Sequence, residues 1–147
     1  MSVTLNVIGA HLYLERDGAV LLGERSADAA FGAGEWHALA GHVEREAVRA
    51  CVVREAQEET GLVLDAEDLT LVHTVHLLGS PDAVPRLQLF FRASRWTGEP
   101  QLLEPDRCRQ GPGGPATRCP RTRWPTPGPR SVGIALGHAY SELGWPT

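Results

Sequence analysis

The hydrophobic and polar positions in the first part of the chain predict a β-hairpin. Residues 7–14 and 19–23 form two short, mostly apolar runs that are typical of strands. Between them lies Arg16-Asp17-Gly18, and an Asp-Gly pair favours the positive φ of a tight turn. A loop rich in alanine and glycine follows over 26–35, and residues 36–39 are expected to form a short strand end.

Residues 46–60 have the periodicity of an α-helix with one apolar side. The apolar positions are Val48, Cys51 and Val52, with Ala56 one turn later. Gly61 follows where a helix often ends in the left-handed conformation. We therefore expect these apolar side chains to face the core.

Two further strands are predicted over 69–78 and 87–96, joined by residues 79–85. Strands, one helix and more strands predict an α/β protein of the α+β kind, not a doubly wound parallel sheet. A chain of 147 residues is long enough for one core, so we expect a single domain over 1–147.

The segment 109–131 breaks this pattern. Six of the eleven prolines and four glycines fall between residues 110 and 130, and no strand or helix period survives there. Two interpretations stay open. The segment is either a frame-shifted, disordered or poorly packed stretch, or an arm rich in arginine and proline that binds an acidic partner.

Composition narrows the class of protein further. A net charge of -4 gives no reason to expect a nucleic-acid polymer or an anionic membrane as partner. Three cysteines without a Cys-x-x-Cys spacing suggest neither a disulfide framework nor a zinc site. No charged-then-apolar leader and no membrane-spanning run is seen, so a cytoplasmic protein is the expectation, and a homodimer stays open.

Three carboxylates lie within one turn of the predicted helix. Glu55 precedes Glu58 by three residues and Glu59 by four, so all three project from one side. Like charges at these spacings destabilise a helix by roughly 0.2–0.5 kcal/mol per pair. The cluster is either a solvated acidic turn or a site for a hard divalent cation such as Mg²⁺, which prefers carboxylate oxygens.

The run from Gly41 to Leu62 resembles the Nudix box. That pattern has Gly, five residues, Glu, seven residues, Arg-Glu, an aliphatic residue, any residue, Glu-Glu, any residue, Gly and an aliphatic residue. The residues that match it in identity and spacing are Glu46, Arg54, Glu55, Glu58, Glu59, Gly61 and Leu62. Two positions depart from it: Gly41 lies five residues before Glu46 instead of six, and Ala56 replaces a larger aliphatic residue.

The resemblance implies an α/β/α sandwich around a mixed β-sheet, with a late strand and a final helix near 110–130. It also implies an enzyme, a pyrophosphohydrolase that cleaves a nucleoside diphosphate linked to another group. Its cofactor would be Mg²⁺, with Mn²⁺ as an alternative, and its partner a small nucleotide. The rival interpretation is a nucleotide-binding module or inactive relative with the same fold, which the shortened loop keeps open.

The same resemblance suggests roles for the box residues. Glu55 and Glu59 are the expected direct metal ligands, and Glu58 is either a third ligand or the base that takes a proton from water. The carbonyl of Ala40 or Gly41 is a candidate backbone ligand. Glu46 and Arg54 are expected to fix the geometry between the loop and the helix.

Further candidates lie outside these positions. Glu104 opens a run, 104–108, that resembles one in some Nudix nucleoside-triphosphate pyrophosphatases, where such a Glu serves as an additional ligand or base. This tips the expected substrate toward a nucleoside triphosphate, although an exposed loop carboxylate is the simpler interpretation. Trp36, His37 and Phe31 either stack on a nucleobase or pack in the core. His42 either contacts phosphate or is solvated.

Overall fold

The structure is a computed structural model that describes residues 2–17, 19–24, 36–101 and 137–146. In chain order its elements are β1 (Val7–Tyr13), β2 (Glu15–Arg16), β3 (Ala19–Val20), β4 (Gly23–Glu24), β5 (Trp36–His37), β6 (Leu39–His42), α1 (Val48–Thr60), the 3₁₀-helix η1 (Ala66–Asp68), β7 (Leu69–Leu77), β8 (Arg86–Ala93) and β9 (Tyr140–Leu143). No helix among these residues is long and apolar enough to cross a membrane.

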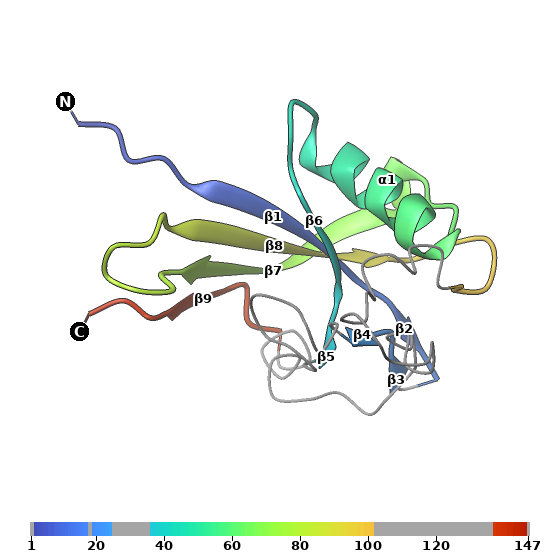
Figure 1. Ribbon diagram of the computed structural model, residues 1–147. Coiled ribbons are helices and arrows are strands. Elements are labelled where there is room, and N and C mark those ends of the chain that lie inside the picture. Colours follow the sequence, from blue (N-terminus) through green and yellow to red (C-terminus); the bar gives the residue numbers. More distant parts are fainter. Residues whose placement is uncertain (1, 18, 25–35, 102–136, 147) are drawn as a thin grey trace, which may run out of the picture.

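Five strands form one mixed sheet in the order β6-β1-β8-β7-β9. β1 pairs with β8, and β7 with β9, in parallel, while the other neighbours are antiparallel. α1 lies on one face of this sheet and contacts β6 and β1 (Figure 1). The predicted α/β fold with a mixed sheet is confirmed. The expected final helix and the segment 109–131 lie outside the described residues.

The predicted hairpin exists but is shorter than expected. Asp17 has a φ of 53°, as the Asp-Gly turn requires, and only the short strands β2 and β3 pair across it. Most of the first predicted strand, now β1, pairs with β6 and β8 instead. The residues of β1 are all buried or half-buried, in keeping with an apolar run that lacks clean alternation.

The two later strands are confirmed as β7 and β8, which pair antiparallel along most of their length. The helix begins at Val48 and not at residue 46, because Ala47 has an extended backbone with φ −69° and ψ 144°. Glu46 therefore lies in the loop before the helix. The helix ends as predicted at Gly61, which has a φ of 73° and donates its backbone N–H to Gln57 O at 2.9 Å.

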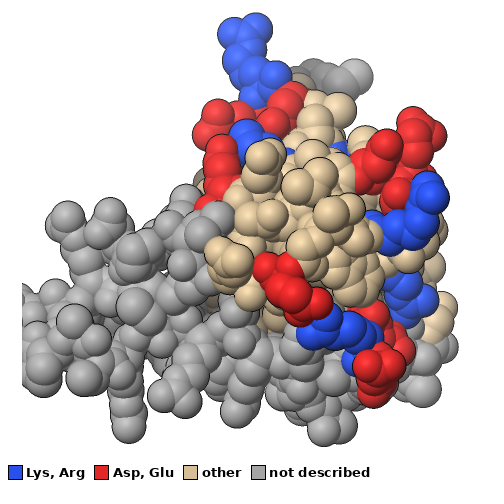
Figure 2. Space-filling view, turned by 90° about the vertical axis from the view of Figure 1, so that its right-hand side faces the viewer, with Lys and Arg blue, Asp and Glu red and all other residues tan. Residues whose placement is uncertain are grey.

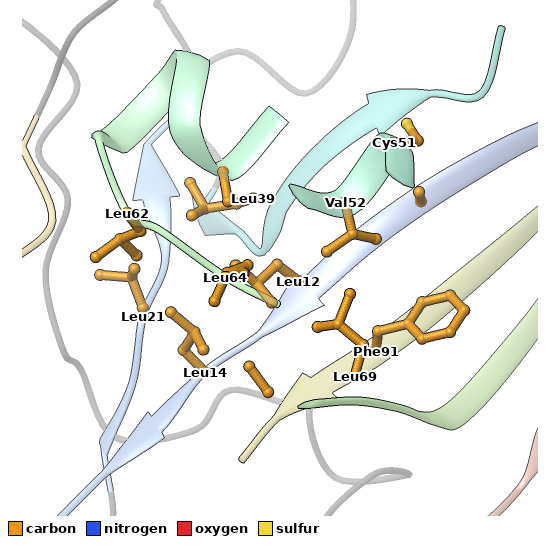
Figure 3. Close-up of a cluster of buried hydrophobic side chains, with 13 residues drawn as sticks. Leu12, Leu14, Leu21, Leu39, Cys51, Val52, Leu62, Leu64, Leu69 and Phe91 are labelled. Atoms are coloured by element: carbon orange, nitrogen blue, oxygen red, sulfur yellow. The ribbon is translucent and has the colours of Figure 1, made fainter. Parts of the chain in front are cut away.

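The core lies between α1 and the sheet (Figure 3). Cys51 and Val52 of the helix belong to the same buried cluster as Leu12 of β1 and Leu39 of β6, as the apolar period predicts. The remaining buried members come from the strands, from the helix and from the segments that connect them: Ala10, Leu14, Leu21, Ala56, Leu62, Leu64, Leu69, Phe91 and Ala93. This packing fixes the helix, and with it the box carboxylates, against β6.

Candidate active site

Glu55 is the most buried of the box carboxylates, with 8% of its surface exposed. Helix α1 presses it against β6 at Gly41, where a Cβ atom would collide with the Glu55 carboxyl group. Gly41 pairs with Ala10 of β1, a core residue, so this position faces the helix. The missing side chain at residue 41 is thus what makes room for the carboxylate.

The two oxygens of Glu55 differ in their surroundings. Oε1 accepts a hydrogen bond from Arg54 Nη1 at 2.8 Å. Oε2 is buried and has no hydrogen-bond partner among the described residues. Buried polar atoms are nearly always partnered, because leaving one unsatisfied costs about 1–3 kcal/mol. An unpartnered carboxylate oxygen in a polar cluster is an open ligand position.

Arg54 connects three of the box glutamates. It makes a two-pronged contact with Glu46, from Nη2 to Oε1 at 2.6 Å and from Nε to Oε2 at 3.3 Å. Its Nη1 donates to Glu58 Oε2 at 3.1 Å as well as to Glu55. The contact with Glu46 ties the loop over 43–47 to the helix, and paired charges of this geometry are among the stronger hydrogen bonds in proteins.

These contacts shift the ionisation of the groups involved. The hydrogen bond from Arg54 lowers the pKa of Glu46, and the reciprocal bond raises the pKa of Arg54. Both groups therefore stay charged at neutral pH. Burial raises the pKa of the neighbouring Cys51 thiol to about 11, so the thiol stays protonated. Its Sγ donates to His42 O at 3.5 Å, which fastens the first turn of α1 to the end of β6.

The described residues contain no group of three His, Cys, Asp or Glu side chains that converge on one point in a way that could hold a metal ion. The reason is visible in the contacts: Glu55 and Glu58 both turn toward the guanidinium of Arg54. The donor set still fits a hard divalent cation. Glu55 offers a free buried oxygen, Glu58 is exposed, and Glu59 is half-buried on the same turn. Oxygen ligands with open positions suit Mg²⁺.

The remaining candidate residues differ in where they lie relative to the glutamate cluster. Ala40 and Gly41 lie in β6, next to the helix. His42 is exposed at the end of that strand, and His37 is half-buried with its Nδ1 2.6 Å from Ala38 O. The Trp36 side chain, Phe31 and Glu104 lie outside the described residues, so their predicted contacts with a nucleotide stay predictions.

One contact had not been expected from the sequence. Arg86 Nη1 lies 3.5 Å from His42 Nε2, although the two residues are 44 positions apart. The available signal was the alternation of Arg86, just before the strand predicted over 87–96, and Gln88 within it, which places two polar side chains on one face. Which residue Arg86 contacts depends on which strands are neighbours in the sheet, and the sequence does not show the strand order.

Comparison with known proteins agrees with this architecture. A model of the NUDIX domain family matches residues 5–110. The MutT NUDIX hydrolase from Burkholderia pseudomallei is similar in structure, with a TM-score of 0.62 and 31% identity over 69% of this chain and 77% of that one. A comparison with curated protein sequences gives no significant match.

Two more solved structures share the fold. The ORF135 protein of E. coli has a TM-score of 0.56 and 25% identity over 67% of this chain and 68% of that one. The MutT protein from Methanosarcina mazei Go1 has a TM-score of 0.56 and 21% identity over 69% and 72%, a likeness that bears on the fold alone. The family match covers most of the chain and includes the whole glutamate cluster. The chain therefore belongs to the Nudix family of hydrolases, which are generally pyrophosphohydrolases of nucleoside diphosphate derivatives.

Proposed function

We propose that this chain hydrolyses the pyrophosphate linkage of a small nucleotide, with a nucleoside triphosphate as the preferred substrate class and Mg²⁺ as cofactor. The observation that carries the proposal is the buried, unpartnered Oε2 of Glu55 in the cradle over Gly41. A charged oxygen held in this way is best explained by a cation that it binds during function.

The roles proposed for the side chains follow from their positions. Glu55 and Glu59 would hold Mg²⁺, with the carbonyl of Ala40 or Gly41 as a backbone ligand. When bound, the ion supplies charge neutralisation at the phosphates and a lower pKa for the attacking water. Arg54 keeps Glu55 oriented through the bond to Oε1 and holds the loop through Glu46.

Glu58 is the proposed base, unless it acts as a third ligand. It is the exposed member of the cluster, so water can reach it. It would take a proton from water as the water oxygen forms a bond to phosphorus, while the bond from that phosphorus to the bridging oxygen breaks and the leaving phosphate departs with the electron pair. The proposed preference for a triphosphate rests on the run that begins at Glu104.

A hydrolysis screen over nucleoside triphosphates, nucleotide sugars, ADP-ribose and dinucleotides, with Mg²⁺ or Mn²⁺, tests the proposal through the release of phosphate or pyrophosphate. Turnover of one class supports a pyrophosphohydrolase, and a triphosphate is the expected class. Nucleotide binding without turnover would instead support the binding module, the alternative that the shortened loop between β6 and α1 keeps open.

A further inference from the structure

Arg86 is an exposed arginine, and within the described residues its side chain contacts His42. Two other arginines in the described part of the chain, one exposed and one half-buried, are paired with carboxylates. Arg95 contacts Asp68 at 2.8 Å and Arg16 contacts Glu99 at 2.8 Å. Figure 2 shows how closely arginine and acidic side chains adjoin on one face of the molecule. An arginine that meets a histidine in place of an acid leaves its charge available to a ligand.

We propose that Arg86, positioned by His42, binds a phosphate of the nucleotide on the face of the sheet opposite α1. The inference rests on the proposed function and deepens it, because it adds a phosphate contact on the far side of β6 from Glu55.

The strand register explains how the two side chains meet across β1. Gly9 of β1 is paired with His42 on one side and with Gln88 on the other. A Cβ atom at Gly9 would collide with the Gln88 carboxamide, which instead bonds to the ring of His11. Arg86 lies two residues before Gln88 and therefore on the same face. The Gln88 side chain occupies the space over Gly9, and Arg86 contacts His42 on the same face of the sheet.

The register also relates this pair to the carboxylates. Gly41 faces the helix and Glu55, and His42 is the next residue, so its side chain projects to the other face. Gly41 and His42 are consecutive, so their Cα atoms are about 3.8 Å apart. β6 is an edge strand of the described sheet. A phosphate chain that runs over this edge, beside the 43–47 loop, would reach both Glu55 and Arg86.

The chemistry of the two side chains sets their roles. Arginine has only N–H donors, so in this contact Nη1 is the donor and Nε2 of His42 the acceptor. One of the five N–H donors of the guanidinium is used in this way, and the others remain for phosphate oxygens. In this proposal His42 is a positioning residue for Arg86, and its own contact with phosphate stays a prediction.

Titration with inorganic pyrophosphate in EDTA, followed by calorimetry or NMR, tests the arginine apart from the metal ligands. Arg86→Gln should weaken binding by about tenfold or more, the effect of losing one or two charge-assisted hydrogen bonds. Arg95→Gln, which removes the same charge from a paired arginine, should leave binding within about twofold of the unmodified protein. Equal losses in both variants, or none in Arg86→Gln, would overturn the proposal.

A second pair of variants tests the positioning role. His42→Gln keeps a hydrogen-bond acceptor and should retain most of the pyrophosphate binding, whereas His42→Leu should lose about as much as Arg86→Gln. In turnover, Arg86→Gln should raise KM and leave kcat within about threefold. Suppose that the unmodified protein hydrolyses no nucleotide but binds pyrophosphate, and that Arg86→Gln weakens this binding. The proposed function then fails, and the phosphate site stands. If Arg86→Gln is active with an unchanged KM and an unchanged affinity for pyrophosphate, the proposed function stands and the phosphate site at Arg86 fails.

Discussion

Glu55 combines a negative charge with a buried position, at 8% exposure, on a helix that packs against the sheet. Burial of a carboxylate is costly unless its oxygens are satisfied. Arg54 satisfies one oxygen and leaves the other open. The open oxygen, together with the space that Gly41 provides, is the feature from which a metal site is inferred.

Gly41→Ala should displace the Glu55 carboxylate, because the new methyl group would occupy its place. We expect Mg²⁺ affinity, measured by calorimetry, to fall at least tenfold, and hydrolysis to fall by about two orders of magnitude. Gly79→Ala is the matched control, since a Cβ at residue 79 meets nothing within 4 Å. If Gly41→Ala binds Mg²⁺ as well as Gly79→Ala does, Glu55 is not a ligand.

The Cys51 thiol should be almost inert toward alkylation at pH 8 in the folded protein, because burial raises its pKa to about 11 and shields it. Iodoacetamide labelling of a Cys108→Ser/Cys119→Ser variant isolates this thiol, and unfolding in urea should release its reactivity.

The same shift makes the free energy of unfolding depend on pH. Between the pKa of the unfolded thiol, about 9, and its folded value, about 11, the folded state holds the proton more tightly. This contribution to stability is present below pH 9 and is lost as the pH rises toward 11. Rapid labelling of folded protein at pH 8 would contradict both statements.

At the scale of elements, the contact between α1 and the sheet sets the position of the carboxylates. Leu62, just after the helix, is fully buried in that core, while its neighbour Val63 is 56% exposed. Leu62→Ala should lower the free energy of unfolding by about 2–5 kcal/mol. Val63→Ala should change it by less than about 1 kcal/mol. Urea denaturation measures both, and equal effects would contradict the packing described above.

The elements also show what the sequence can predict and why. The period of Val48, Cys51 and Val52 predicts the buried side of α1, and Gly61 predicts its end, because both signals are local. The start of the helix was predicted two residues too early, at Glu46 in place of Val48, since the sequence carries no strong capping residue there. The partners of β1 were not predictable, because an apolar strand does not encode which distant strand lies beside it.

The part of the site that could be predicted is the part that local spacing along the sequence determines. Glu46, Arg54 and Glu55 are placed together by a fixed pattern along one helix and its approach, and the structure brings them into contact. Arg86 was missed because its contact with His42 depends on the register of three strands, β6, β1 and β8. Long-range register of this kind is a property of the folded sheet.

At the scale of the whole molecule, the chain returns to the sheet after the segment 109–131. β9 pairs in parallel with β7, and His73 lies buried beneath it, with Nδ1 2.6 Å from His138 O and Nε2 3.0 Å from Ser141 Oγ. Trp145 Nε1 donates to His76 O at 3.1 Å. β9 and Trp145 lie beyond residues 5–110, which the family model matches.

The central claim is that the Glu55 cluster supports pyrophosphate hydrolysis with a divalent cation. The most direct test is the hydrolysis rate of the best nucleotide from the screen, measured in EDTA and then with excess Mg²⁺, for the unmodified protein and for Glu55→Gln. We predict no turnover in EDTA, full recovery with Mg²⁺, and a loss of about two orders of magnitude or more in a folded Glu55→Gln variant. Undiminished turnover in EDTA, or a Glu55→Gln variant as active as the unmodified protein, would contradict the account.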